Sequence, residues 1–317
     1  MSEVSRLVCL VGQTASGKSS LAMGLAEQLG CELLSVDSMQ VYRGFDIGTA
    51  TPSRDEQERV RHHGIDLVDP QETFSAGAFL EYARSVLTEA RTRGVPVLAV
   101  GGTGLYLRAL LHGLTPSAPA DTDFRARLRL EEQGSPGAAH LRLSKVDPEA
   151  AGRIHPNDFV RTERALEVFE TTGETQTSWV ARHAWSDTPF STELLGIQWE
   201  REALRLRIAA RVDDMLARGW VDEVRGLLEA GVTEDMTPML ALGYREIAAH
   251  LRGELELDVL RVRVSTAISR FAKRQGTWFN REPSIAWMAP GPDLLQRALP
   301  RVRQALFPLG STDPRED

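Results

Sequence analysis

The segment GQTASGKS, residues 12–19, constrains the fold of this chain more than any other stretch. It has the spacing G-x-x-x-x-G-K-S, directly follows the apolar run 6–12, and opens a segment with helical spacing that ends at Gly30. In that context the backbone N–H groups of the loop wrap a phosphate chain at the N-terminus of a helix. The segment therefore predicts a phosphate-binding loop between a buried strand and a helix.

Strand and helix patterns alternate along the rest of the chain. Short apolar runs predict strands at 6–12, 31–38, 95–102, 193–200 and 285–290. Helical spacing predicts further helices at 75–94, 103–114, 200–218, 220–230, 238–252 and 256–280. This alternation is typical of a parallel sheet with helices on its faces. The expected fold class is α/β, with a P-loop parallel sheet core flanked by helices and an all-helical insertion domain.

The domain boundaries follow from a change in composition. Residues 115–123, TPSAPADTD, separate the strand–helix pattern from an arginine-rich helical segment. A chain of 317 residues is long enough for two cores. We expect a catalytic core formed by 1–114 and 191–290, a helical insertion at 115–190, and a C-terminal helix with a disordered tail at 291–317.

Composition narrows the class of protein. Hydrophobic content of 42% and charged content of 26% are typical of soluble globular proteins, and the absence of a long apolar run or signal-peptide layout argues against a membrane partner. Cys9 and Cys31 stand in apolar contexts, which favours buried thiols in a reducing cytoplasm. The net charge of −7 argues against a generic nucleic-acid binder but leaves room for a local basic stripe.

Three segments are expected to meet at the carboxyl edge of the sheet. They are the phosphate loop, Asp37 after the second strand, and the segment 101–104, GGTG, which is either a tight turn or a close backbone approach to phosphate. Thr103 would cap the next helix and direct its hydroxyl to the same pocket. The strand 95–102 ends without the carboxylate that a nucleotide hydrolase needs, so Asp37 is the acid at this edge, either as a metal ligand or as a base.

Basic residues carry two further signals. Only three of the 37 basic residues are lysine, so Lys18 indicates a need for a compact point charge. The segment 263–282 combines basic and aromatic residues, which suits either nucleic-acid contact or a solvated face. Arg161 and Arg164 share a helix face, where they would contact phosphates or pair with neighbouring glutamates.

Five segments in this order resemble one known family. They are GQTASGKS (12–19), DSMQVYRGFDIGTATP (37–52), GGTGLYLRALLHGL (101–114), LGYREIAAHLRG (242–253) and AKRQGTWF (272–279). Together they resemble the bacterial tRNA dimethylallyltransferases, also called tRNA isopentenyltransferases, over about residues 6–285. The chain departs from the family pattern with Gln13 where proline is usual, Gly276 where a bulkier residue is common, and Thr51 where lysine is usual.

The resemblance implies transfer of a dimethylallyl group from dimethylallyl diphosphate to N6 of the adenosine 3′-adjacent to the anticodon of a tRNA. Asp37 would be the general base, and Lys18, Thr103 and Arg211 would act on the leaving diphosphate. Mg²⁺ would bind at Ser19. The diphosphate-binding residues would be Gly12, Gln13, Thr14, Ala15, Ser16, Gly17, Lys18 and Ser19.

The resemblance also implies contacts to the anticodon stem-loop, reached by a base that leaves its stack. The expected tRNA-binding residues are Asp37, Ser38, Met39, Gln40, Thr103, Arg125, Arg161, Arg164, Lys273, Arg274 and Gln275. We expect a cytoplasmic monomer. Two other classes stay open on the motifs alone: a P-loop kinase that uses ATP with Asp37 as base for a hydroxyl, and a regulatory nucleotide-binding module without turnover.

Overall fold

The computed structural model describes residues 6–114, 120–182 and 190–307. It divides the chain into two compact units, one formed by Met1–Leu111 with Pro189–Asp317 and the other by His112–Thr188. We call them the core unit and the insertion unit. The insertion unit begins three residues before the expected segment 115–190 and ends two residues earlier.

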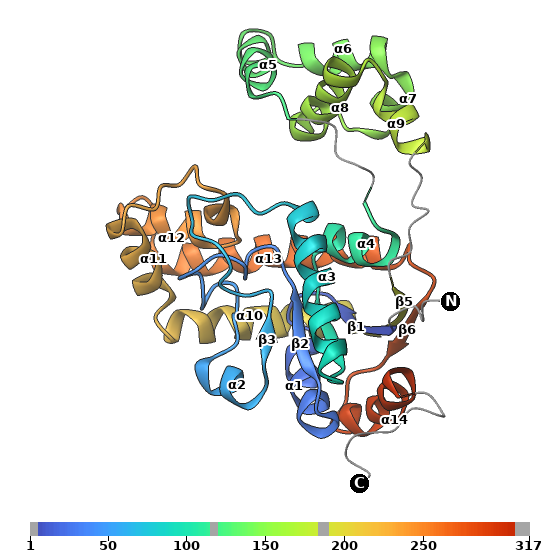
Figure 1. Cartoon of the computed structure of the whole chain (residues 1–317). Helices are drawn as coiled ribbons and strands as arrows, with labels where there is room; N and C mark the ends of the chain where they lie inside the picture. The colour runs from blue at the N-terminus through green and yellow to red at the C-terminus, as the bar shows by residue number, and fades with distance from the viewer. Residues whose placement is uncertain (1–5, 115–119, 183–189, 308–317) are drawn as a thin grey trace. The chain divides into compact units, whose positions relative to one another are not determined.

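One six-stranded parallel sheet forms the centre of the core unit (Figure 1). Its strands are β1 (Arg6–Gly12), β2 (Glu32–Val36), β3 (His62–His63), β4 (Val97–Gly101), β5 (Ser191–Ile197) and β6 (Ile285–Met288), in the order β3-β2-β4-β1-β5-β6. In the register of the sheet, Gly101 pairs with Val11 on one side and with Val36 on the other. The carboxyl ends of β1, β2 and β4 therefore lie level at one edge. The five predicted strands are confirmed, and the two-residue strand β3 was not predicted.

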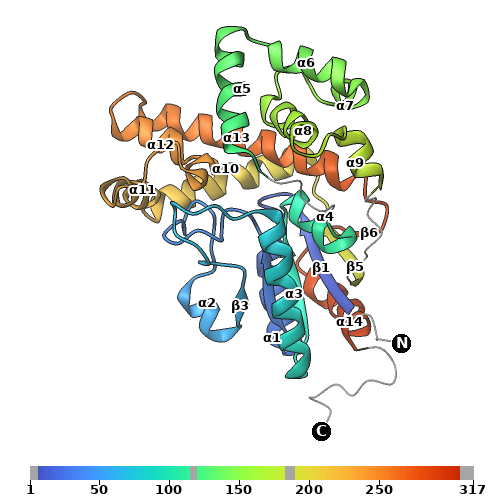
Figure 2. The same cartoon turned by 45° about the horizontal axis from the view of Figure 1, so that its top comes forward.

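Helices cover both faces of the sheet. The helix α1 (Lys18–Leu29) connects β1 to β2, and α3 (Ala76–Thr92) connects β3 to β4 in the opposite direction along the sheet. Because such connections are right-handed, the two helices lie on opposite faces. Val8 and Leu10 of β1 pack with α1 and with α14 (Leu294–Leu306). On the other face α3 lies beside α4 (Gly104–His112), where the rings of Phe79 and Tyr106 stack 4.1 Å apart (Figures 1 and 2). The C-terminal helix is thus part of the core unit, while the expected disordered tail lies outside the described residues.

A second group of helices packs beyond the carboxyl edge of the sheet (Figure 1). It consists of α10 (Arg201–Ala217), α11 (Trp220–Glu229), α12 (Tyr244–Leu251) and α13 (Leu257–Phe279). Trp220 and Tyr244 are fully buried here, together with Phe45 from the segment after β2. The segment after β2 also contains α2 (Arg54–Arg59).

The predicted continuous helix at 238–252 is wrong. The structure has a 3-10 helix at Thr237–Leu240, a break, and then α12 from Tyr244. Gly243 adopts φ +98, and a Cβ at this position would lie 2.2 Å from the ring of Trp220. The close approach of the buried Trp220 ring requires the backbone to turn here, which ends any continuous helix.

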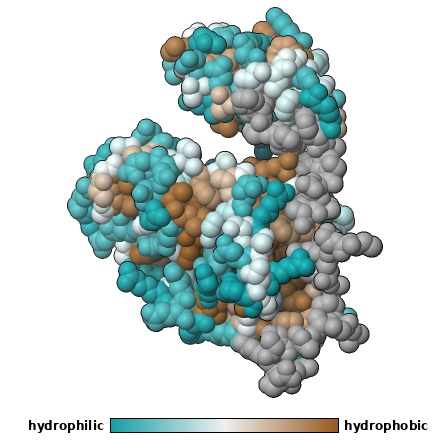
Figure 3. Space-filling view, in the orientation of Figure 1, coloured by the Kyte–Doolittle hydropathy of each residue, from teal (hydrophilic) through white to brown (hydrophobic). Residues whose placement is uncertain are grey.

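The insertion unit is entirely helical in its described part. Its helices are α5 (Thr122–Gly134), α6 (Ala138–Val146), α7 (Pro148–Arg153), α8 (Phe159–Thr172) and α9 (Gln176–Arg182). Phe124, Leu143 and Leu166 lie at the centre of a separate small core. Hydrophilic side chains cover much of the face of this unit in Figure 3. Across the described residues of both units, we find no helix with the length and apolar character needed to cross a bilayer.

Candidate active site

The phosphate loop joins β1 to α1 with two left-handed backbone conformations. Gly17 has φ +91, and Ala15, which is not a glycine, has φ +63. Backbone N–H groups turned inward by such conformations form an anion-binding concavity, which the N-terminus of α1 reinforces. The Ser16 hydroxyl is buried there and has no hydrogen-bond partner among the described residues. The loop therefore has the conformation and the donors expected of a phosphate site.

Two residues from outside the motif hold the loop in this conformation. Arg207 of α10 donates from Nε to the carbonyl oxygen of Ala15 at 2.9 Å, and Trp199 donates from Nε1 to the carbonyl oxygen of Ser16 at 2.9 Å. The Arg207 guanidinium lies 4.4 Å from the centre of the Trp199 ring. These contacts stabilise the left-handed Ala15 backbone, which costs free energy in a non-glycine residue. Neither residue was predicted from the sequence.

Helix α13 holds the loop from another side. Gln13 donates from Nε2 to the Ala272 carbonyl oxygen at 2.7 Å, while Gln275 accepts from the Thr14 N–H at 2.8 Å and donates to the Gly102 carbonyl oxygen at 3.0 Å. Gln275, which we expected at the tRNA, is 8% exposed and uses both ends of its amide inside the protein.

The side chain of Gln13 lies beside Gly276 of α13. A Cβ on Gly276 would lie 3.0 Å from the Gln13 Nε2 atom. Glycine at this position therefore leaves the space in which the Gln13 side chain reaches helix α13.

Asp37 follows β2 at the edge where β1 and β4 end. Its Oδ1 atom accepts from the Met39 N–H at 2.9 Å. Thr103 links this turn to β4, because its N–H donates to the Val36 carbonyl oxygen at 3.2 Å and its hydroxyl accepts from the Ser38 N–H at 3.1 Å. Thr103 directly precedes α4, and its carbonyl oxygen accepts the first bond of that helix, from the Leu107 N–H. Its hydroxyl binds Ser38.

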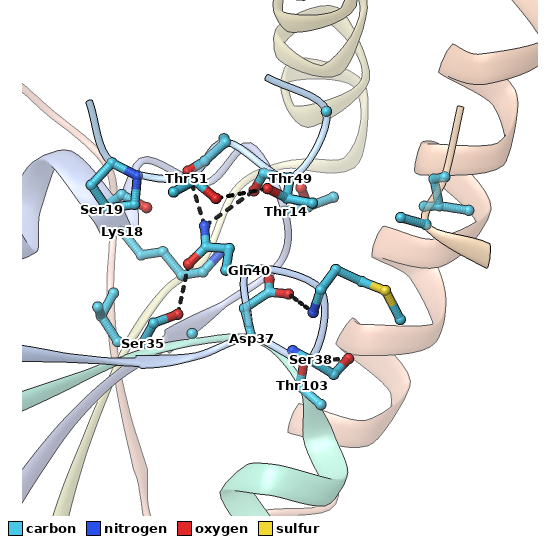
Figure 4. Close-up of a pocket in the computed structure, with 18 of the residues that line it drawn as sticks. Thr14, Lys18, Ser19, Ser35, Asp37, Ser38, Gln40, Thr49, Thr51 and Thr103 are labelled. Atoms are coloured by element: carbon cyan, nitrogen blue, oxygen red, sulfur yellow. Dashed lines mark hydrogen bonds between the residues drawn. The ribbon is translucent and has the colours of Figure 1, made fainter. Parts of the chain in front are cut away.

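These segments surround one cavity of about 500 Å³. Figure 4 shows the Lys18 side chain running from the phosphate loop toward Asp37 and Gln40. Polar and charged residues of the wall include Thr14, Lys18, Ser19, Ser35, Asp37, Ser38, Gln40, Glu56, His62, Thr103, Arg211, Arg218 and Arg274, and apolar residues include Met23, Leu33, Met39, Leu240, Ile268 and Phe271. The cavity thus combines an anion site, the two carboxylates of Asp37 and Glu56, and apolar surface.

Two cations of the cavity, Lys18 and Arg211, are destabilised by their surroundings. Burial and the neighbouring Arg211 lower the pKa of Lys18 to about 8, although Asp37 partly opposes the shift. Burial also lowers the pKa of Arg211, with Asp37 again acting in the opposite direction. Enclosed cations with lowered pKa values are stabilised when an anion binds, so the electrostatics favour a negatively charged ligand.

Residues 48–53 form another wall of the cavity. Gln40 accepts from the Ser35 hydroxyl at 2.6 Å and donates to the carbonyl oxygens of Thr49 and Ala50 at 3.1 and 2.9 Å (Figure 4). Gln40, which we expected at the tRNA, thus ties this segment to β2. Thr51 is 9% exposed, and its hydroxyl lies 2.9 Å from that of Thr49.

Two basic residues of α13 differ in their position relative to the cavity. Arg274 lines the cavity, and its guanidinium lies 5.6 Å from the centre of the Phe271 ring. Lys273 is exposed on the same helix. Both side chains are exposed, but only Arg274 is among the residues that line the cavity.

The three expected arginines of the insertion unit have acidic neighbours. Arg125 makes a bidentate pair with Glu167 at 2.7 and 2.8 Å, and Arg164 pairs with the same carboxylate, which is fully buried. Arg161 is exposed, and its guanidinium lies 3.5 Å from Asp158. Pairing with a glutamate, which the sequence left open for Arg164, therefore occurs in the structure.

A metal site built from protein side chains alone is not found in the described part of the chain, where no three residues among His, Cys, Asp and Glu cluster suitably. Ser19 and Asp37 both line the cavity and offer oxygen atoms. Mg²⁺ favours such a set when substrate phosphates complete its coordination. The donor set therefore fits a cation that arrives with a diphosphate.

Comparisons with known proteins identify the family. A model of the family described as IPP transferase matches residues 40–282, which excludes the phosphate loop and Asp37, so these two features are independent of that match. A protein from Geobacter metallireducens named tRNA dimethylallyltransferase is 48% identical over 287 residues, which cover 90% of this chain and 93% of that protein.

Solved structures show the same similarity. A full-length tRNA isopentenylpyrophosphate transferase from Bacillus halodurans is 36% identical with a TM-score of 0.70, covering 95% of this chain and 96% of that one. A eukaryotic dimethylallyltransferase, described as acting on tRNA, is 28% identical with a TM-score of 0.81, covering 95% and 79%. Sequence similarity over nearly the whole chain agrees with the fold and with the phosphate loop, and the chain belongs to the IPP transferase family.

Proposed function

We propose that this protein transfers the dimethylallyl group of dimethylallyl diphosphate to N6 of the adenosine 3′-adjacent to the anticodon in tRNA and releases diphosphate. The observation that carries the proposal is that the carboxylate of Asp37 lines the same cavity as Lys18 of the phosphate loop. The cavity thus joins a site for a leaving diphosphate to a base for an incoming amine. Family membership and the names of the relatives support this reaction.

The proposed reaction forms one carbon–nitrogen bond, breaks one carbon–oxygen bond and transfers one proton. The N6 lone pair attacks the allylic carbon, while the carbon–oxygen bond breaks and its electron pair leaves with the diphosphate. Lys18, Arg211 and the loop N–H groups stabilise the charge that develops on the leaving oxygen. Asp37 accepts the proton that N6 loses. No water needs activation, which agrees with β4 ending at Gly101 rather than at a carboxylate.

Ser19 and the diphosphate oxygens would hold Mg²⁺ in this proposal. When bound, the cation would supply further positive charge to the leaving group. Asp37 lines the same cavity as Ser19, so a contact between Asp37 and the cation is a second role to be tested.

The tRNA would be held by two surfaces. The adenosine would leave its stack and enter the cavity beside Ser38 and Met39, with Lys273 and Arg274 of α13 on backbone phosphates. The insertion unit would bind the anticodon stem, with Arg161 as its most exposed candidate, while Arg125 and Arg164 act mainly through Glu167. We further propose that one chain is sufficient, because the cavity is lined by residues of a single core unit.

A tRNA-dependence assay tests the proposal. Diphosphate should be released from dimethylallyl diphosphate only when tRNA is present, with one prenyl group gained per tRNA. Formation of ADP from ATP with a small hydroxylated acceptor would instead support a kinase, which the relatives do not favour. Tight nucleotide binding without any product would support a regulatory module. Sedimentation of the active enzyme gives its oligomeric state.

A further inference from the structure

The segment 46–53, of which residues 48–53 line the cavity, is held from outside by one carboxylate. Glu223 of α11 accepts from the N–H groups of Asp46 at 3.1 Å, Ile47 at 2.6 Å and Gly48 at 3.4 Å. These three N–H groups belong to consecutive residues, so a single side chain fixes the start of the segment. Glu223 itself does not line the cavity.

Tyr244 completes the arrangement around this carboxylate. Its hydroxyl donates to Glu223 Oε1 at 2.7 Å, and its ring is fully buried. Burial, followed by the neighbouring Glu223, raises the pKa of Tyr244 well above its ordinary value, so the hydroxyl keeps its proton and remains a donor. The two carboxylate oxygens thus receive four donors from the protein.

The backbone at Gly48 is packed so closely that it has no room to shift toward the helices. A Cβ on Gly48 would lie 2.3 Å from the Trp220 ring nitrogen and 2.5 Å from the Tyr244 ring. On the other side, Gln40 binds the carbonyl oxygens of Thr49 and Ala50. The segment is therefore held at consecutive residues from opposite sides, and its next residues reach the wall beside Thr14, Lys18 and Ser19.

We propose that Glu223 is a positioning residue for the diphosphate donor, which it influences by fixing the segment 46–53 and not by touching substrate. The proposal rests on the proposed function, since the donor is the ligand of the phosphate loop. Only a carboxylate can accept all four hydrogen bonds, because a glutamine amide presents one oxygen and would direct its own N–H groups at backbone donors. Loss of the carboxylate therefore releases the segment and widens the donor end of the cavity.

Glu223→Gln tests this directly. Hydrogen bonds to a charged group stabilise a structure by more than neutral ones do, so their loss should raise KM for dimethylallyl diphosphate about 10-fold or more. The value of kcat at saturating donor should fall less, and tRNA affinity should stay unchanged. Tyr244→Phe removes one neutral donor and should raise the same KM by about 2- to 10-fold. Amide hydrogen exchange should accelerate in the segment 43–53 in both variants. Glu229→Gln, the same change at an exposed position of α11, is the matched control and should alter none of these values.

Several outcomes would overturn the proposal. Unchanged KM in Glu223→Gln despite faster exchange would show that the segment does not position the donor. In Glu223→Gln, equal loss of kcat, tRNA affinity and melting temperature would show a general folding role. If Glu223→Gln does not fold, an unchanged KM in Tyr244→Phe would also overturn the proposal. Binding of inorganic diphosphate separates the two proposals. If the wild-type enzyme transfers no prenyl group, the proposed function fails. The positioning role can still be tested in that case, because it predicts weaker diphosphate binding in Glu223→Gln.

Discussion

The cavity of the core unit and the helices of the insertion unit give two sets of cations opposite surroundings. In the core unit, Lys18 and Arg211 line a cavity, where burial lowers the pKa of each. In the insertion unit, Arg125 and Arg164 bind the buried carboxylate of Glu167. Burial alone would raise the pKa of Glu167, but hydrogen bonds from Arg125, from the Asp121 backbone N–H and from Arg164 outweigh it and hold the pKa at about 2.

The difference separates ligand-binding charge from structural charge. A cation with a lowered pKa has lost hydration without gaining full compensation, so an arriving anion stabilises it. A carboxylate with a lowered pKa already receives N–H donors from its partners, so those donors are used within the protein before another ligand arrives. An arginine-rich sequence segment therefore overstates the number of contacts that a nucleic acid can gain.

The largest expected effect comes from Asp37→Asn in the core unit. The amide keeps the size and the hydrogen bond to the Met39 N–H but cannot take a proton, so the chemical step should slow roughly 10²- to 10⁴-fold while tRNA affinity changes little. Single-turnover rates at saturating tRNA and donor, repeated over a Mg²⁺ series, measure this. A step slowed by less than about tenfold would remove Asp37 as the base. A defect repaired by added Mg²⁺ would make it a metal ligand instead.

Lys18→Ala should have the next largest effect. Loss of one donor to a developing oxyanion costs about 10²–10³ in rate, and Lys18 is the mobile cation of the phosphate loop. Lys18→Arg should also be poor, because a planar guanidinium does not replace a compact ammonium in the enclosed site. Steady-state kinetics with a parallel tRNA-binding measurement decides the point. Turnover close to that of the wild type would place the diphosphate somewhere other than this loop.

Donor affinity should weaken as the pH rises through the pKa of Lys18. Burial and Arg211 lower this pKa to about 8 in the free enzyme, so the charged ammonium that binds the donor predominates below that pH and disappears above it. Each pH unit above the pKa should raise the donor Kd about tenfold. The Lys18→Arg variant should bind weakly with a flat profile, because its guanidinium stays charged. A flat profile in the wild type would contradict a contact between Lys18 and the donor.

Much of the core unit was predictable because its signals are local. Buried parallel strands appear as short apolar runs, and the carboxyl-edge rule then brought the phosphate loop, Asp37 and Thr103 to one cavity without any knowledge of contacts. The helix α2 also had a local signal that was overlooked, since Ser53 and Glu56 form a capping box.

The contacts that hold the site were not predictable from one sequence. Glu223 lies 176 residues from Ile47, and Arg207 lies 192 residues from Ala15, so no local pattern connects them. Glutamate and arginine on an amphipathic helix usually face solvent, and nothing in the spacing of α10 or α11 marks these two as exceptions. The break at Gly243 was missed for the same reason, because it depends on the distant ring of Trp220.

The smallest expected effect separates two arginines of α8 in the insertion unit. Arg161→Gln should weaken tRNA binding a few-fold and reduce the slope of log affinity against log salt by about 0.7–0.9, the value for one phosphate contact, while the melting temperature stays unchanged. The reason is that Arg161 is exposed, and its ion pair with Asp158, at 3.5 Å, contributes little stability in water.

Arg164→Gln is the matched comparison on the same helix. It leaves buried Glu167 with one arginine fewer, so the insertion unit should melt earlier, and the salt slope should change less than in Arg161→Gln. Salt titrations of tRNA binding and thermal melts of both variants measure the two effects. An equal change of salt slope in both would mean that Arg164 exchanges Glu167 for a phosphate when tRNA binds, and no change in either would place the tRNA on another surface of the protein.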